Sequence, residues 1–184
     1  MIRIAYKKER YRRLLADMVD EGDTVIEVGP HLGKSTRGYV NRAEKVFAVD
    51  KSPQAKEAMN ELQRECPNLV FVEGDVRSFE TVEALMKETG ECDLLAVDMG
   101  GGRYPDTVFK VWATLSGVFE PKKSLIRNRG LAEFVQRAEV ADKSVIKDFH
   151  VNGWLSEYGR GIPYKLKKQL DEFRFWVDIT EKLD

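Results

Sequence analysis

The sequence predicts an α/β fold in which a mostly parallel sheet of six to seven strands carries helices on both faces. Two observations support this prediction. Short apolar segments alternate five times with segments of helical period, which is the pattern of a parallel sheet covered on both sides. Several apolar segments end in an acid, and the first runs into a turn that contains glycine. The chain of 184 residues is long enough for a single domain with a sizeable core.

The first half of the chain is expected to supply a leading helix, three strands and two connecting helices. Residues 6–19 place apolar side chains at helical spacing among many Lys and Arg residues, which predicts a basic amphipathic helix. Ser52 is a good N-cap and Pro53 suits a first helical turn, so a helix is expected to begin there. A short helix is also expected from about residue 34 to residue 41. The strands are expected at 24–28, 45–50 and 69–72.

The second half continues the alternation up to about residue 140 and then becomes less regular. Helices are expected over 80–89, from about 106 to 117 and over 131–138, and strands over 93–98 and 123–127. Residues 99–105 contain three consecutive glycines and are expected to form a loop. A basic helix is expected over 163–170 and a final strand over 173–179. Within one domain, 1–184, we therefore expect an N-terminal helix (1–20), a core (21–140) and a substrate-side segment (141–184).

Composition and charge exclude several classes of protein. The net charge of −1 argues against wholesale binding to a phosphate backbone but leaves room for a local basic patch. No apolar run approaches the roughly 20 residues that span a bilayer. No secretory signal is recognisable at the N-terminus, so a cytoplasmic protein is expected. Cys66 and Cys92 are far from each other and from both histidines in sequence, which argues against a disulfide framework and a zinc site.

The turn after the first strand has three interpretations. A P-loop is one, because Gly33-Lys34-Ser35 looks like the end of the phosphate-binding motif. That motif needs four residues between its glycines, however, and Gly29 and Gly33 enclose only three. A dinucleotide-binding turn is the second, but it needs G-x-G-x-x-G, and His31 and Lys34 stand at the later glycine positions. The glycine spacing therefore argues against both a P-loop and a dinucleotide-binding turn.

The third interpretation rests on a resemblance. The segment Glu27-Val-Gly-Pro-His-Leu-Gly-Lys-Ser-Thr36, with Asp50 after the second strand and Gly74-Asp75 after the third, resembles the class I S-adenosylmethionine-dependent methyltransferases over about residues 20–130. Asp98 followed by Arg103-Tyr104-Pro105 is similar to the catechol and caffeoyl-CoA type O-methyltransferases. The resemblance implies a Rossmann-like methyltransferase fold and S-adenosyl-L-methionine as cofactor. The cofactor-binding residues that it implies are Glu27, Gly29, Pro30, His31, Gly33, Ser35, Asp50, Lys51, Gly74, Asp75, Val76 and Asp98.

The implied activity is an enzymatic methyl transfer to an oxygen of a small or anionic acceptor. Asp98 is the expected catalytic residue, as a group that positions the acceptor or takes its proton. Metal-dependent relatives hold magnesium with acids after the fourth and fifth strands, but this chain has Arg127-Asn128 at the second place. A guanidinium cannot ligate a cation, so no metal is expected. Arginine suits phosphate or carboxylate. The expected substrate-binding residues are Arg103, Tyr104, Arg127 and Asn128.

Two other functions stay open at this point. The basic leading helix, Asp98-Met99 and a basic residue in the fifth strand resemble RNA ribose 2′-O-methyltransferases, although those enzymes have a lysine where this chain has Arg127. No Asn/Asp-Pro-Pro-Tyr/Phe follows the fourth strand, which argues against methyltransferases of adenine or glutamine amines. A regulatory protein that binds S-adenosylmethionine without catalysis is the second alternative, because the second metal-binding acid is missing.

Overall fold

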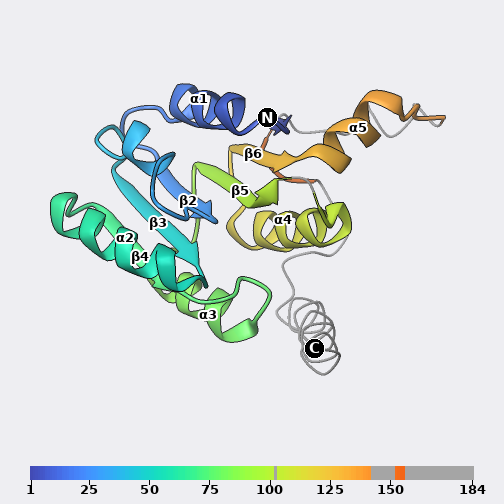
Figure 1. Cartoon of the computed structure of the whole chain (residues 1–184). Helices are drawn as coiled ribbons and strands as arrows, with labels where there is room; N and C mark the ends of the chain where they lie inside the picture. Colours follow the sequence, from blue (N-terminus) through green and yellow to red (C-terminus); the bar gives the residue numbers. More distant parts are fainter. Residues whose placement is uncertain (102, 142–151, 156–184) are drawn as a thin grey trace.

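The computed structural model describes residues 1–101, 103–141 and 152–155, and its centre is one sheet of six strands (Figure 1). The strand order is β1-β6-β5-β2-β3-β4, and every neighbouring pair is parallel. The predicted parallel α/β fold is therefore confirmed. The strands are β1 (Ile2–Ala5), β2 (Thr24–Val28), β3 (Lys45–Asp50), β4 (Leu69–Glu73), β5 (Leu94–Gly101) and β6 (Lys123–Asn128).

The helices lie on both faces of this sheet. In Figure 1, α1 and α4 lie on opposite sides of β5 and β6. Buried side chains of α1 and α2 pack on one face, and those of α3 and α4 pack on the other. The helices are α1 (Lys8–Met18), α2 (Pro53–Glu65), α3 (Phe79–Glu88), α4 (Pro105–Phe119) and α5 (Arg129–Arg137), with a 3-10 turn, η1 (Thr36–Gly38).

The two hydrophobic layers follow from the alternation of side chains along each strand. In β2, Val25 packs on the layer with α1 and α2, whereas Ile26 packs on the layer with α3 and α4. Both side chains are fully buried. Because both faces are covered, the central strands are apolar at successive positions rather than at alternate ones. Among the described residues, no helix combines the length and the apolar character that crossing a membrane requires.

The order of the strands reverses at β2, and this reversal determines where the candidate site lies. From β2 the chain proceeds through β3 to β4 at one edge of the sheet, and β5 and β6 lie on the other side of β2. The crevice outside the carboxyl ends of β2 and β5 is therefore a topological switch point, where ligands of open α/β sheets bind. The loops after β2, β3, β4 and β5 all meet at this edge.

The structure corrects the sequence predictions in three places. The helix expected over 34–41 is wrong, because this segment forms turns around the short η1. The strand β1 was not predicted, since only four residues, one of them Arg3, carry its signal. β5 continues through part of the predicted glycine loop to Gly101, with an irregularity in its register after Asp98. The helix expected over 163–170 and the strand expected over 173–179 lie outside the described residues.

Candidate functional site

A cavity of about 1080 Å³ opens at the carboxyl edge of the sheet. Its wall comes from the ends of β2, β3, β5 and β6, the turn after β4, and the first turns of α1 and α4. Most of the residues predicted to bind a cofactor are in this wall. They are Gly29, Pro30, His31, Ser35, Asp50, Lys51, Gly74, Asp75, Val76 and Asp98, and the predicted substrate residues Tyr104 and Arg127 join them.

Gly29 makes the closest backbone approach in this wall. Its φ of 78° lies in the left-handed region, and its N–H donates to the carbonyl of Val49 at 2.9 Å. A Cβ at this position would overlap the backbone carbonyl of Asp98 in the neighbouring strand. Only glycine therefore allows the end of β2 to pass β5 in this conformation.

His31 continues the turn in an unusual conformation for a residue with a side chain. Its φ is 52°, and its backbone N–H donates to Asp50 Oδ2 at 3.1 Å. The other carboxylate oxygen of Asp50 accepts from the N–H of Ser52 at 2.9 Å. Asp50 thus holds the turn after β2 and the start of α2 together. A carboxylate has about four lone-pair sites, so these two bonds leave acceptor capacity at the cavity wall.

Glu27 lies behind the cavity rather than in its wall. Its side chain is 1% exposed and accepts from the hydroxyls of Ser35 at 2.6 Å, Thr36 at 2.6 Å and Tyr39 at 2.7 Å. Burial raises the pKa of Glu27, and these three donors offset only part of that effect. The structure thus places Glu27 where it fixes the segment after the glycine turn. These hydroxyl bonds hold that segment against β2 in a non-helical path, which is why the predicted helix is absent.

Asp75 closes the cavity near the end of β4. Arg77 donates from Nε and Nη2 to the two carboxylate oxygens, the shortest distance being 2.6 Å, and Lys51 Nζ lies 3.1 Å away. Partial burial acts to raise the pKa of Asp75, but the bonds from Arg77 and Lys51 prevail and lower it to about 2. Asp75 is therefore ionised at neutral pH and tied to two cations.

Asp98 and Arg127 form an ion pair between the ends of β5 and β6. They are register partners in the sheet, and Arg127 Nη1 lies 2.8 Å from each carboxylate oxygen of Asp98. Both side chains are largely buried. The Nε of Arg127 is buried and has no hydrogen-bond partner among the described residues. The predicted catalytic acid and one predicted substrate arginine thus meet, although sequence analysis did not pair them.

Three other predicted residues contact neighbouring elements of the fold instead of the cavity. Gly33 packs against side chains of α2, and Asn128 is buried, caps α5 by accepting from the N–H of Leu131 at 3.0 Å, and donates to the carbonyl of Arg103 at 3.1 Å. Neither Gly33, Asn128 nor Arg103 lines the cavity. Tyr104 does, with 68% of its surface exposed. No cluster of three or more His, Cys, Asp or Glu able to hold a metal occurs among the described residues.

Sequence analysis missed the contribution of α1 to the cavity. Lys8, Tyr11 and Arg12 line it. The Tyr11 hydroxyl is buried without a partner among the described residues. Burial raises the pKa of Tyr11 well above its ordinary value, and the nearby charges of Glu27 and Asp98 raise it further. Tyr11 stays neutral and can donate a hydrogen bond. The only signal was its place in the apolar stripe of the helix, which equally predicts a core residue.

Comparison with solved structures decides the fold family. A ribosomal RNA methylase from Streptococcus thermophilus superposes with a TM-score of 0.51 at 16% identity, over 71% of this chain and 78% of that one. The chain has the Rossmann-like methyltransferase fold. No family model matches the sequence.

Two curated relatives share part of the sequence. The ribosomal RNA small subunit methyltransferase A of Staphylococcus carnosus is 28% identical over 82 residues, which are 45% of this chain and 28% of that protein. The protein of the same name from Dehalococcoides mccartyi is 36% identical over 72 residues, which are 39% of this chain and 25% of that protein. The chain thus matches only about a quarter of the length of these relatives.

The approach of Gly29 to Asp98 is tested by comparing two glycines. Gly22 and Gly29 both have positive φ, 84° and 78°, but a Cβ at Gly22 would meet nothing within 4 Å. Gly22→Ala should cost only the backbone strain of about 1 kcal/mol. Gly29→Ala should lower the free energy of unfolding, measured in urea, by about 1–3 kcal/mol more because of the overlap. Equal costs for the two variants would contradict the close approach.

The ion pairs of Asp75 predict a dependence of stability on acid pH. The folded pKa of about 2 lies below the ordinary value of 3.8 for an Asp carboxyl, so the contribution is fully present above about pH 5 and is lost as pH falls toward 2. Asp75→Asn should therefore reduce the free energy of unfolding by about 2 kcal/mol at pH 7, with the curves of both proteins converging near pH 2. Asp17→Asn, at an exposed position of α1, controls for the loss of one charge. A constant difference between pH 7 and pH 2 would contradict the assignment.

Proposed function

We propose that this chain is an S-adenosylmethionine-dependent methyltransferase that acts on RNA. The observation that supports this cofactor is the Gly29 turn beside the Asp50 carboxylate at the switch point of the sheet. The backbone of the turn can approach a ligand closely, and the adjacent carboxylate keeps lone pairs for the two hydroxyls of a ribose. Val76, Met99 and Val108 give the same cavity apolar surface for a purine.

The geometry gives no support to a P-loop, whereas a dinucleotide site would share the switch point and the ribose-binding acid, and the turn without G-x-G-x-x-G is what argues against it. Asp50 has the place of a ribose-binding acid, and Asp75 with Lys51 and Arg77 closes the adjacent wall. In the proposed complex, Gly29 and Pro30 lie under the methionine part of the cofactor, and Gly74, Asp75 and Val76 border its adenine. Glu27 and Gly33 act indirectly, by fixing the turn.

RNA is favoured over a small acceptor by the relatives. The curated relatives with matching sequence are ribosomal RNA methyltransferases, whereas the likeness to catechol and caffeoyl-CoA type enzymes rests on a few residues. The cavity is also bordered by Lys8 and Arg12, which have no salt bridge among the described residues and suit a phosphate-bearing acceptor. The expectation of a small anionic acceptor therefore gives way to RNA as the proposed substrate.

In methyl transfer, a nucleophilic atom of the acceptor forms a bond to the sulfonium methyl as the methyl–sulfur bond breaks, and the electron pair of the broken bond stays on sulfur. A hydroxyl or amine acceptor releases its proton to water, so positioning contributes much of the rate. Well-oriented reactants gain up to roughly 7–11 kcal/mol. Asp98 lies in the cavity wall beside Gly29, and its ion pair with Arg127 fixes its carboxylate. We assign Asp98 the role of positioning the acceptor. No step of this proposal uses a metal ion.

The first prediction concerns the cofactor. Asp50→Ala should weaken S-adenosylmethionine binding by about 1–3 kcal/mol, the usual cost of removing a charged hydrogen-bond partner. Glu73→Ala is the matched control, because Glu73 also ends a strand and is the register partner of Asp50 but does not line the cavity. Equilibrium dialysis with labelled cofactor measures both. Equal losses in the two variants would contradict the role of Asp50.

The second prediction concerns the acceptor. Incubation with methyl-labelled S-adenosylmethionine and either total RNA or a metabolite extract should place label in the RNA, and ribonuclease should release it as small fragments. Label that enters only the metabolite extract would contradict RNA as the substrate. Binding of the cofactor without transfer to either pool would contradict catalysis and favour a regulatory protein.

A further inference from the structure

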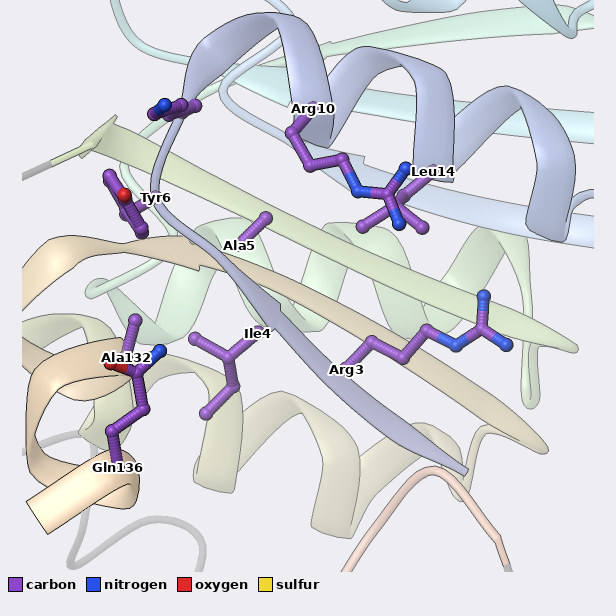
Figure 2. A pocket seen from close by; sticks show the side chains of 9 residues that line it. Arg3, Ile4, Ala5, Tyr6, Arg10, Leu14, Ala132 and Gln136 are labelled. Atoms are coloured by element: carbon purple, nitrogen blue, oxygen red, sulfur yellow. The ribbon is translucent and has the colours of Figure 1, made fainter.

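A second hollow lies outside the cofactor cavity, at the free edge of the sheet (Figure 2). Its volume is about 590 Å³. It runs along β1 between the beginning of α1 and α5, and Figure 2 shows Arg10 and Leu14 projecting from α1 and Ala132 and Gln136 from α5. We call it the β1 groove; it is lined by Arg3, Ile4, Ala5, Tyr6, Lys7, Arg10, Leu14, Ala132 and Gln136.

The charge of the β1 groove is positive. Arg3, Lys7 and Arg10 line it and are exposed. The contacts found for these cations are weak: Arg3 Nε donates to the sulfur of Met1 at 3.1 Å, and Lys7 Nζ lies 5.9 Å from the centre of the Tyr6 ring. Among the described residues, no salt bridge neutralises any of the three. The groove therefore keeps most of its positive charge for a ligand.

Some surface cations of this protein are paired, whereas others, such as Lys34, Lys45 and Arg64, are exposed and have no salt bridge among the described residues. Lys56 lies 2.7 Å from Glu73, Lys122 lies 2.6 Å from Asp93, and Arg37 lies 2.7 Å from Glu65. In a chain with a net charge of −1, the β1 groove brings three cations without a salt bridge, Arg3, Lys7 and Arg10, to one hollow. Basic residues can also serve only to protect an edge strand from pairing with another chain, and the experiment below separates the two roles.

Tyr6 adds an aromatic surface to this positive groove. Its side chain is 45% exposed, and it directly follows β1, at the edge of the sheet where the cofactor cavity opens. Grooves that combine cations with exposed aromatic rings bind single-stranded nucleic acid, because phosphates meet the cations and bases stack on the rings. A duplex hides its bases and gives no use for an aromatic ring in this place.

The first turns of α1 connect the β1 groove with the cofactor cavity. Lys7, Arg10 and Leu14 line the groove, whereas Lys8, Tyr11 and Arg12 line the cavity. The same helix thus presents cations to both hollows, on neighbouring faces of its N-terminal half. A single-stranded nucleic acid that lies in the β1 groove can cross the start of α1 and place one nucleotide in the cofactor cavity.

We propose that the β1 groove binds the sugar-phosphate backbone of single-stranded RNA next to the nucleotide that receives the methyl group. This proposal rests on the proposed function, because it names where the RNA substrate of that function is held. Arg3, Lys7 and Arg10 contact phosphates, and Tyr6 stacks on a base. The cofactor cavity is left free for S-adenosylmethionine and the acceptor nucleotide.

The test compares two double charge reversals of equal size. Arg3→Glu with Arg10→Glu changes the groove, and Lys45→Glu with Arg64→Glu changes exposed positions on β3 and α2, away from both hollows. The probe is a fluorescein-labelled single-stranded RNA of about 20 nucleotides, and its affinity is measured by fluorescence anisotropy at several KCl concentrations. The groove variant should bind at least about tenfold more weakly, with a salt slope smaller by about 1.4, which is about 0.7 for each of the two lost phosphate contacts. Thermal melting and S-adenosylmethionine binding should stay at wild-type levels in both variants.

Several outcomes would overturn the proposal. They are equal losses in the two double variants, wild-type RNA affinity in the groove variant, tighter binding of a matched RNA duplex than of the single strand, and equally good competition by polyglutamate. Wild-type affinity in the groove variant is the result expected if the cations only protect the edge strand. If the wild-type chain methylates RNA and the groove variant binds as tightly, only the groove proposal fails. If the groove variant loses RNA binding and the wild-type chain transfers no methyl group to RNA, only the proposed function fails.

Discussion

The close passage of Gly29 past the Asp98 carbonyl is the constraint on which the candidate site depends. It brings the end of β2 against the end of β5 without an intervening side chain. The turn that follows can then reach Asp50 through the N–H of His31. Glu27 supports this turn, because its buried carboxylate accepts hydrogen bonds from the hydroxyls of Ser35, Thr36 and Tyr39. The backbone floor and its rigid support thus come from one short stretch of sequence, and the carboxylate of Asp50 joins them from the end of β3.

The charges around the cavity are arranged in pairs that leave particular atoms free. Asp75 is satisfied by Lys51 and Arg77, and Asp98 by Arg127. The buried Tyr11 hydroxyl and the Nε of Arg127 have no partner among the described residues. An unsatisfied buried donor is costly, and the contacts among the described residues do not offset that cost for these two donors. Acceptor capacity at the wall remains at Asp50.

Sequence analysis predicted what depends on local pattern. The buried strands that carry the cavity were visible as apolar runs, and the glycine spacing argued against the P-loop before any geometry was known. The sequence predictions failed where contacts between residues far apart in sequence determine the local structure. A helix was expected in the segment after Gly33, but Ser35, Thr36 and Gly38 give it low helix propensity, and three hydroxyl bonds to Glu27 hold it in turns. β1 is too short to signal itself, and its pairing with β6 alone makes it a strand. The Asp98–Arg127 pair depends on strand register, which no local pattern reveals.

The fold is that of methyltransferases, and the central claim is that the cavity at its switch point holds S-adenosylmethionine. Isothermal titration calorimetry of the wild-type chain tests this claim most directly, with S-adenosylmethionine, S-adenosylhomocysteine and ATP as separate ligands. We predict binding of the first two at a single site with a stoichiometry of one, and no binding of ATP. Binding of ATP alone, or of none of the three, would contradict the account.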